Sequence, residues 1–237
     1  MPKKRNEKQT LGTSLLANPT KKKTNTVRHW DRAYRLPLSE IPWEIPEPPT
    51  VLTSFLDSGL VPPGKALDVA CGSGNYSIFL AQRGFDVSGV DVSKNALALA
   101  REKIKNAGLE KKVRLVQADC RELAVAFKGE KFGLILDWSL LHHVAPEDVE
   151  AYAGQFSELL APGGVLLLTC FSEKDAPQAG QTSATGKMGN VMYYRTRAQI
   201  ESAYRPLKVL EYRECRLGKK GNHAGHCLLF RNVKAID

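Results

Sequence analysis

The sequence predicts an α/β fold with a doubly wound, mostly parallel seven-stranded sheet that ends in an antiparallel hairpin. Between residues 65 and 171, short apolar segments alternate with segments of helical periodicity. The apolar segments do not alternate with polar residues, which is typical of parallel strands buried on both faces. Two further strand candidates near the C-terminus are separated by a glycine-rich turn, which predicts the hairpin.

Composition fits one soluble globular domain with an extension. The chain has 237 residues, of which 43% are hydrophobic and 25% charged. No apolar run approaches the roughly 20 residues of a membrane-spanning helix, so we expect no membrane span. The five cysteines are an odd number without a close pair. They favour reduced thiols and a cytoplasmic location over a disulfide scaffold, and we expect no metal site.

The N-terminal part of the chain carries most of its charge. Residues 1–28 hold eight basic side chains and one acid, which is +7 of the net charge of +9. We expect residues 1–26 to form a basic, solvated and disordered tail, with RNA contact as the alternative. Residues 27–60 are expected to form an N-terminal cap segment. Prolines from position 37 onward exclude a long helix there, whereas Trp30 and Trp43 indicate packing on the domain.

The elements follow in order from residue 50, where a short helix is expected at about 50–58. Strands are expected at 66–70, 86–90, 113–117, 132–136 and 165–170, with helices at 76–83, 93–108 and 146–160. Ser93 is placed to cap its helix and Gly108 to end it. The last part predicts a helix at 195–204 and strands at 208–216 and 226–233. Residues 172–194 are polar and aperiodic, which predicts a long connection and a candidate substrate lid.

The turn after the first strand is the sharpest local feature. Gly72 and Gly74 lie between a strand and a helix, so a ligand can approach the backbone and the helix N-terminus. Asp91 ends the next strand and is placed to accept hydrogen bonds from ribose hydroxyls. The alternatives are a bare tight turn and a strand-end cap. Position 77 is Ser, a partial match to a dinucleotide motif, and Asp68 suits a ligand that carries a cation, so spacing alone leaves the nucleotide open.

Five ordered segments resemble the motifs of class I S-adenosylmethionine-dependent methyltransferases, whose fold is Rossmann-like. Within residues 64–171 they are Leu67–Gly74, Val90–Ser93, Gln117–Cys120, Phe132–Asp137 and Leu160–Gly164. The stretch with Trp30 and Pro42–Trp43 is more loosely similar to the N-terminal segment of thiopurine-methyltransferase-like enzymes. The resemblance implies S-adenosylmethionine as cofactor and methyl transfer to a small-molecule acceptor by in-line displacement.

The resemblance also implies roles for individual residues. The glycine loop would cradle the methionine part of the cofactor, with Asp68 near its ammonium group and Asp91 at the ribose. Asp119 and Cys120 would border the adenine, and residues 137–139 would line the methionine side and the mouth of the substrate pocket. The full cofactor set is Trp30, Trp43, Asp68, Ala70, Cys71, Gly72, Gly74, Asp91, Val92, Asp119, Cys120, Asp137, Trp138 and Ser139.

Two kinds of side chain are candidates for the chemistry itself. The aromatic faces of Trp30, Tyr34 and Trp43 can hold a sulfonium cation, or simply pack the cap on the core. His142 and His143 follow the fourth strand and have the right chemistry for a general base. The alternative is that one histidine is buried and satisfied and the other exposed. A thiol or amine acceptor needs no protein base.

Three other functions stay open at this point. The first is RNA or protein methylation recruited by the basic arm. The second is a non-catalytic adaptor that binds S-adenosylmethionine, and the third is an NAD(P) oxidoreductase. The Asp/Asn-Pro-Pro-aromatic motif of amino-methylating nucleic-acid enzymes is absent, since residues 137–140 read Asp-Trp-Ser-Leu. Cys170 lacks the Pro-Cys partner motif of RNA cytosine-5 enzymes and is expected to be a buried core residue. The acceptor atom and the oligomeric state are not indicated.

Overall fold

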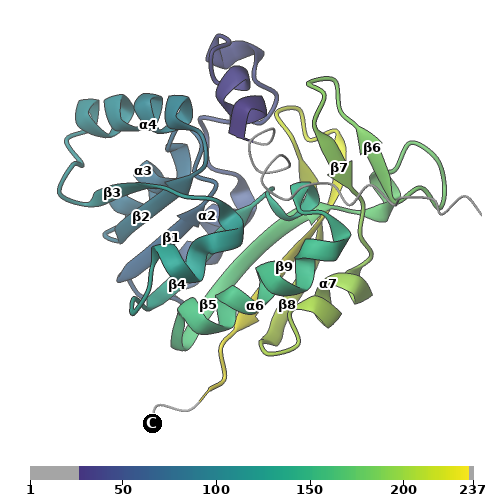
Figure 1. The fold of residues 1–237 in the computed structure, drawn as a ribbon. Coiled ribbons are helices and arrows are strands. Elements are labelled where there is room, and N and C mark those ends of the chain that lie inside the picture. Colours follow the sequence, from purple (N-terminus) through teal and green to yellow (C-terminus); the bar gives the residue numbers. More distant parts are fainter. Residues whose placement is uncertain (1–26, 235–237) are drawn as a thin grey trace, which may run out of the picture.

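The computed structural model describes residues 27–234, so the predicted tail at 1–26 lies outside the described residues. Its main sheet has seven strands in the order β3-β2-β1-β4-β5-β9-β8 (Figure 1). Pairing is parallel from β3 to β5 and antiparallel for β9 with both β5 and β8, which confirms the predicted fold class. The strands are β1 (Lys65–Val69), β2 (Asp86–Asp91), β3 (Val113–Gln117), β4 (Phe132–Trp138), β5 (Leu160–Phe171), β8 (Lys208–Leu217) and β9 (His223–Arg231).

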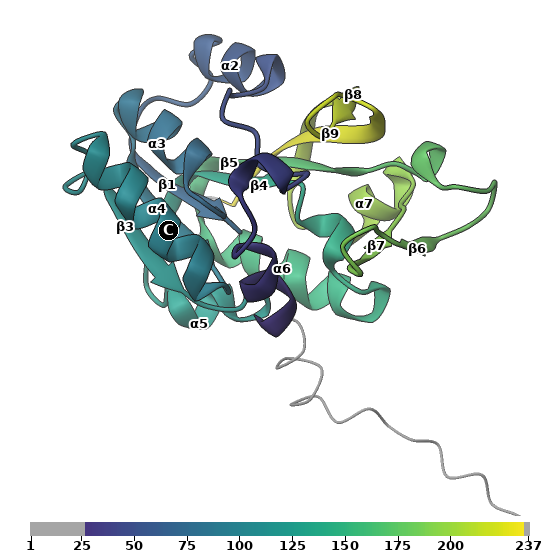
Figure 2. The same ribbon diagram turned by 90° about the horizontal axis from the view of Figure 1, so that it is seen from above.

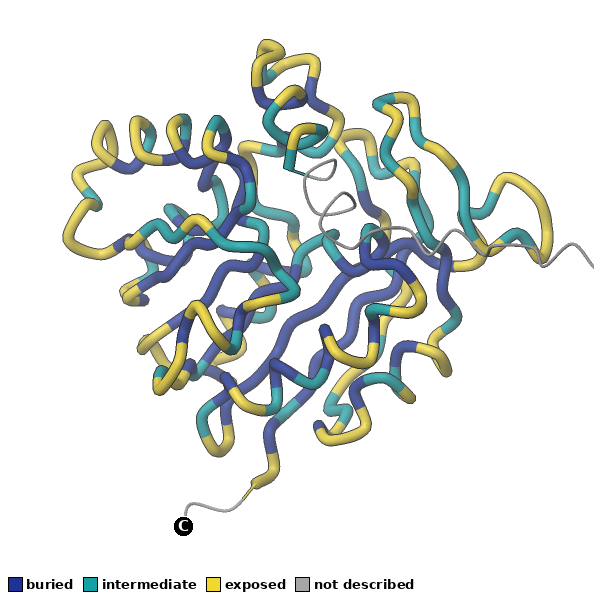
Figure 3. The backbone as a smooth tube through the Cα atoms, in the orientation of Figure 1, coloured by how far each residue is buried: buried dark blue, intermediate teal, exposed yellow. Residues whose placement is uncertain are grey.

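Helices cover both faces of this sheet and bury two separate hydrophobic cores. One core is formed with α2 (Thr50–Asp57), α3 (Asn75–Gln82) and α4 (Lys94–Asn106). The other is formed with α5 (Leu123–Ala126), α6 (Val149–Leu159) and α7 (Arg197–Ala203). Figure 3 shows the central strands as the most continuously buried part of the chain. This double burial explains why the strand sequences are apolar throughout.

Helix α4 follows the local signals in its sequence. The Ser93 hydroxyl accepts a hydrogen bond from the Ala96 amide at 3.1 Å, as an N-cap residue does. Gly108 adopts a φ of +68° just beyond the helix, a left-handed conformation that glycine tolerates and most residues do not. Both predicted boundaries of this helix are confirmed.

The cap segment 27–60 contains more helix than its prolines suggested. Residues 27–33 are helical, and a 3-10 turn, η1 (Leu38–Glu40), and α2 follow. The first helix ends before Pro37, so the prolines limit its length without preventing it. In Figures 1 and 2 the part of this segment before α2 lies across the end of the sheet at which β1 and β4 finish, whereas α2 packs on one face of the sheet.

Residues 172–194 are also more ordered than predicted. They contain a 3-10 turn, η5 (Glu173–Asp175), and a small antiparallel sheet of β6 (Ser183–Thr185) and β7 (Val191–Tyr193). This hairpin lies at the same end of the main sheet as the cap segment (Figure 1). Within residues 27–234, no helix has both the length and the apolar character needed to cross a membrane.

Candidate active site

The order in which successive strands are added to the sheet reverses between β1 and β4, and the site is expected at this point. The chain runs from β1 to β2 on one side, and β4 lies on the other. In open α/β sheets, ligands bind outside the carboxyl ends of the strands at such a switch point. Here Ala70 and Ser139, which follow these two strands closely, adopt φ values of +55° and +65°. Strained residues of this kind cluster at functional sites.

Asp91 joins the glycine loop to the turn after β2. Its Oδ2 accepts a hydrogen bond from the Gly72 amide at 2.9 Å, and its Oδ1 accepts one from the Ser93 amide at 2.8 Å. Each oxygen of a carboxylate can accept about two hydrogen bonds, so capacity remains for hydroxyl donors. Burial raises the pKa of Asp91 to about 6, although the backbone hydrogen bonds act in the opposite direction. This geometry fits the predicted contact with a ribose.

Asp68 is a second buried carboxylate close to the first. Its Oδ2 accepts a 2.6 Å hydrogen bond from the Ser77 hydroxyl at the start of α3. Burial raises its pKa to about 7, and the charge of Asp91 adds to this effect. Among residues 27–234, neither carboxylate forms an ion pair with a basic side chain. Two buried acids without a cation complement a ligand that brings its own positive charge, as S-adenosylmethionine does.

The space next to the two glycines is filled by protein atoms. A β-carbon on Gly72 would lie 2.3 Å from the Tyr34 hydroxyl oxygen, and one on Gly74 would lie 3.0 Å from the β-carbon of Ala100. The Trp43 indole donates a 3.0 Å hydrogen bond to the same Tyr34 hydroxyl. Gly72 therefore makes room for the cap segment, and Gly74 for the packing of α4. The predicted approach of a ligand to Gly72 requires Tyr34 to share or leave this position.

A polar cluster from the cap segment holds it to the glycine loop. The buried Glu44 carboxylate accepts hydrogen bonds from Lys103 Nζ at 2.8 Å, Ser73 Oγ at 2.5 Å and Asn75 Nδ2 at 2.8 Å. Burial alone would raise the pKa of Glu44, but its bonds to Lys103 and Ser73 outweigh that effect and lower it. Glu44 carries no motif and lies 59 positions from Lys103, so the sequence analysis missed it.

A second contact holds the cap segment to the N-terminus of α4. Asp31 Oδ1 accepts a 2.8 Å hydrogen bond from the Ser93 hydroxyl, and Asn95 Nδ2 donates to the Asp31 carbonyl at 2.8 Å. Ser93 also donates its amide to Asp91. The cap segment therefore contacts both turns that Asp91 connects. This second contact was also missed, because nothing in the sequence relates Asp31 to Ser93.

The residues predicted to border an adenine lie after β3. The Asp119 carboxylate accepts hydrogen bonds from Arg121 Nε at 2.9 Å and Nη2 at 2.6 Å. Burial raises the pKa of the Cys120 thiol, so this thiol is protonated at neutral pH. The carbonyl of Val92 accepts a 3.2 Å hydrogen bond from Gln117 Nε2. Arg121 is an addition to the predicted set, and contact of this group with an adenine stays a prediction.

Asp137 is turned away from the other two buried acids. Alternate residues of a strand face opposite sides of the sheet, and Asp137 shares its side with α6 rather than α3. The Tyr152 hydroxyl donates a 2.8 Å hydrogen bond to Asp137 Oδ2, and the carboxylate is fully buried. Burial raises its pKa to about 7. The structure thus gives the Asp137 side chain a partner on the α6 side, and contact of this residue with the methionine part of a cofactor stays a prediction.

Trp138, the last residue of β4, and Ser139 directly after it lie at the end of the sheet where the site is expected. The Trp138 ring meets the Tyr76 ring edge-on with a centroid distance of 5.7 Å. The Ser139 amide donates to the Thr169 hydroxyl oxygen at 3.0 Å, which fixes the strained turn at the end of the strand. Both residues are partly exposed. They remain the candidates for the mouth of an acceptor pocket.

The two candidate bases lie in η3 (Leu141–His143), directly after this turn. His142 is 3% exposed, stacks on Phe171 at 3.8 Å, and has an Nδ1 without a hydrogen-bond partner in the described part of the chain. His143 is half-buried, its Nδ1 lies 3.1 Å from the Val191 carbonyl, and its ring lies 5.0 Å from that of Trp30. Burial lowers the pKa of His142 well below its usual range and that of His143 to about 4. Both imidazoles are neutral at pH 7.

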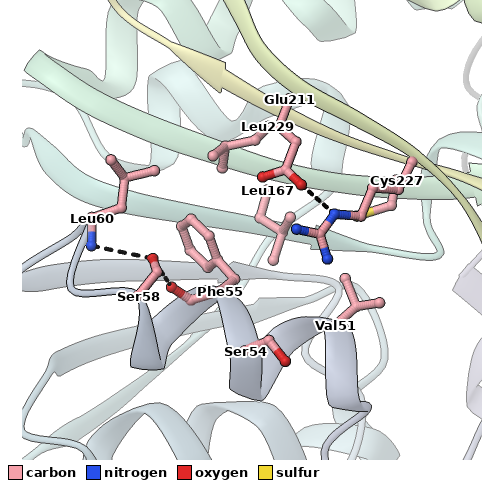
Figure 4. Close-up of a pocket in the computed structure, with 10 residues that line it drawn as sticks. Val51, Ser54, Phe55, Ser58, Leu60, Leu167, Glu211, Cys227 and Leu229 are labelled. Carbon is pink, nitrogen blue, oxygen red and sulfur yellow. Dashed lines mark hydrogen bonds and ion pairs between the residues drawn. The ribbon is translucent and has the colours of Figure 1, made fainter.

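A hollow elsewhere in the molecule is not part of this site. A small hollow of about 80 Å³ lies between α2 and the strands β5, β8 and β9 (Figure 4). It is lined by residues such as Phe55, Leu167 and Leu229, with Glu211 and Arg213 paired at its side. No predicted site residue lines it. Within residues 27–234, no group of three or more His, Cys, Asp or Glu side chains is arranged to hold a metal ion.

Known proteins resemble this chain over the region that builds the site. Residues 66–164 match a family model described as methyltransferase domain. The putative methyltransferase YqeM from Bacillus subtilis is 30% identical over 122 residues, which cover 51% of this chain and 47% of YqeM. The probable thiol methyltransferase 2 from Arabidopsis thaliana is 27% identical over 147 residues, which cover 62% of this chain and 63% of that protein. The chain thus spans less than two thirds of either relative.

A solved structure shows the same architecture. The N-methyltransferase NodS from Bradyrhizobium japonicum, in complex with S-adenosyl-L-homocysteine, aligns with a TM-score of 0.67 and 19% identity. The alignment covers 89% of this chain and 100% of NodS, and at this identity it supports the fold alone. Three observations point to the same fold: the sheet order, the contact of the glycine loop with Asp91, and the sequence matches. Residues 66–164 therefore match the methyltransferase-domain family, and the chain has the Rossmann-like fold of class I S-adenosylmethionine-dependent methyltransferases.

Proposed function

We propose that this protein transfers a methyl group from S-adenosylmethionine to a small-molecule acceptor. The observation that carries the proposal is the Asp91 carboxylate, which joins the glycine loop to the β2–α4 turn and keeps free acceptor capacity. Asp68, close by, adds a second buried carboxyl group, which a cationic ligand would favour in its ionised form. Together they favour a ligand with hydroxyl donors and a cation.

The reaction depends mainly on the alignment of the acceptor atom, the methyl group and the sulfur. When bound, S-adenosylmethionine supplies a methyl group on a sulfonium, which an acceptor can displace in line. Proximity and orientation can provide about 7–11 kcal/mol of such a barrier. In this chain Asp68 and Asp91 would hold the cofactor, with Ala70, Cys71 and Gly72 shaping the loop between them. Trp138 and Ser139 would border the acceptor, because they follow β4 at the same edge of the sheet.

The acceptor side is formed by neutral, aromatic groups. Trp30 and Trp43 of the cap segment lie with ring centroids 5.2 Å apart, and Trp30 packs edge-on against His143. His143 and His142, both neutral, would take the proton from an acceptor that arrives protonated. A small aromatic or thiol-containing molecule suits such surroundings better than a phosphate-rich polymer. The thiol methyltransferase among the relatives supports the choice of a small acceptor.

Cofactor binding tests the proposal directly. Isothermal titration with S-adenosyl-L-homocysteine should show binding to the wild-type chain and a loss of at least about tenfold in affinity for Asp91→Asn. Asp86→Asn is the matched control, since Asp86 starts the same strand β2, is exposed and pairs with Lys112. Equal affinity for the two variants, or no binding by the wild type, would contradict the proposal.

The alternative functions receive less support. Recruitment of RNA or a protein by the basic arm depends on residues 1–26, which lie outside the described residues. Deleting them should leave turnover of a small acceptor unchanged under the proposal. A non-catalytic adaptor would bind the cofactor but transfer no methyl group in any acceptor screen. A cytosolic location is consistent with five free cysteines and remains a proposal.

A further inference from the structure

Arg195 is a buried cation that ends the segment 172–194. It is 6% exposed and forms no ion pair with a carboxylate among residues 27–234. Its guanidinium instead donates to three backbone carbonyls. Nη1 donates to Tyr193 at 3.5 Å, and two carbonyls around η3 accept the other bonds, Leu141 at 2.9 Å from Nη1 and Val144 from Nη2. Burying a charge is costly, and these hydrogen bonds offset part of that cost.

The two carbonyls bracket the candidate bases. Leu141 begins η3 and Val144 follows its end, so the histidines at 142 and 143 lie between them. The Leu141 carbonyl also accepts from the Val144 amide at 3.1 Å, and a planar guanidinium can bond to this carbonyl and to that of Val144 at once. A lysine ammonium at the same place can donate well to only one of these two carbonyls. Arg195 therefore fixes the position of η3 against the 172–194 segment.

The same segment also fixes the hydrogen positions on His143. Val191 in β7 presents its carbonyl oxygen to His143 Nδ1 at 3.1 Å. A carbonyl only accepts hydrogen bonds, so Nδ1 carries the proton and Nε2 carries the lone pair of the neutral ring. His143 remains neutral at pH 7 because burial lowers its pKa to about 4, against the effect of the Val191 bond.

We propose that Arg195 is a positioning residue for acceptor deprotonation: it holds η3 against β7 so that the Nε2 lone pair of His143 stays free and fixed. The proposal rests on the proposed methyl transfer and applies to an acceptor that arrives as a hydroxyl. In the step, the acceptor oxygen forms a bond to the methyl carbon as the carbon–sulfur bond breaks and leaves its electron pair on sulfur. The hydroxyl proton passes to Nε2 and then to water.

The first measurement is the tautomer of His143, read by long-range ¹H–¹⁵N NMR of the full chain at neutral pH. The variants are Arg195→Met and Arg195→Lys, with Arg197→Met as the matched control. Arg197 is exposed, pairs with Glu201 and lies over the Tyr212 ring. We expect the Nδ1–H tautomer in wild type and control, and a mixture of tautomers in Arg195→Met. Wild-type signals in Arg195→Met would overturn the proposal. If Arg195→Met does not fold, Arg195→Lys decides by the same criterion.

The second measurement separates positioning from general damage. Two probes are used, 3,4-dihydroxybenzoate with protonated hydroxyls and 4-nitrothiophenol, whose thiol is ionised at neutral pH. In Arg195→Met, loss of alignment of the base should lower kcat for the hydroxyl probe by about 100-fold. The kcat for the ionised thiol should stay within about threefold of wild type. Equal losses on both probes, or none on the hydroxyl probe, would overturn the proposal. Neither result bears on the proposed function, which fails instead if the wild type does not bind S-adenosyl-L-homocysteine.

Discussion

The Tyr34 hydroxyl stands 2.3 Å from the point where a β-carbon on residue 72 would lie. Gly72 also donates its amide to Asp91, so the cap segment and the carboxylate proposed to bind the cofactor meet at one glycine. Under the proposed function, contact with the cap segment and contact with the cofactor are coupled through this residue. This relationship gives a direct test of how tightly the cap segment closes on the loop.

Gly72→Ala should destabilise the protein by about 2–4 kcal/mol, because it adds a clash with Tyr34 to the strain of a φ of +55°. Tyr34→Phe removes the clashing oxygen and leaves the next ring atom at 3.4 Å. The double variant should therefore recover part of the loss in urea unfolding. Gly108→Ala serves as control, since its φ is +68° and no atom of residues 27–234 lies within 4 Å of its β-carbon position. A cost no larger than that of the control would show that Tyr34 does not occupy this position in solution.

Lys103→Met should loosen the cap segment. It removes the cation from the buried Glu44 carboxylate, which keeps only Ser73 and Asn75 as partners. Breaking such a pair from one side costs about 3–5 kcal/mol when it is fully buried, and less here because Lys103 is about 30% exposed. We expect faster limited proteolysis within residues 27–49. The control is Lys112→Met, which breaks the exposed pair with Asp86 and should leave the cleavage rate unchanged.

The buried acids predict how stability depends on pH. Asp68 and Asp91 have pKa values of about 7 and about 6 in the folded chain, above the ordinary value of 3.8. Between pH 4 and 7 these two carboxyl groups bind more protons in the folded chain than in the unfolded one, so their contribution to the stability of the ligand-free protein falls as the pH rises, whereas the neutral His142 and His143 act in the opposite direction. A cationic ligand favours the ionised carboxylates. The rise in Tm on adding S-adenosylmethionine should therefore be larger at pH 7.5 than at pH 5, and the opposite order would contradict these assignments.

Asp137→Asn should keep both the fold and cofactor binding. The amide oxygen can still accept from Tyr152, and a neutral group replaces a buried carboxylate whose pKa is about 7. We expect an affinity for S-adenosyl-L-homocysteine within about threefold of wild type, measured by calorimetry. Tyr152→Phe should cost about 1–3 kcal/mol instead, because it leaves a buried acceptor without its donor. A large loss of affinity in Asp137→Asn would return this residue to the cofactor site.

The sheet was predictable because each strand carries its own signal. Runs such as 132–136 are apolar and short, and glycines or capping residues mark the neighbouring turns. The β6–β7 hairpin was not predicted, since its strands have three residues each and lie among polar residues. β7 packs against η3, a contact between distant parts of the chain that the local sequence does not encode.

Residues of the site were predictable only where they belong to a local sequence motif. The glycine loop and Asp91 follow from strand–turn–helix spacing, and the structure places them together. The orientation of Asp137 could have been inferred, because Leu134 and Leu136 face the α3 side and the strand alternates. Glu44 and Arg195 could not, because each is a charged residue whose burial depends on partners far along the chain.

The two ends of the 172–194 segment lie side by side, through a bridge between Ser172 and Arg195 and a 3.1 Å hydrogen bond from the Glu173 amide to the Arg195 carbonyl. A loop that leaves and returns at one point can change length at an entropic cost of only about 0.6 kcal/mol per doubling. The residues between these ends form an excursion that evolution or an engineer could replace without shifting the strands beneath it. We therefore expect exchange of this excursion to change acceptor preference and, through loss of the Val191 carbonyl, the tautomer of His143, with the methyl-donor side unchanged.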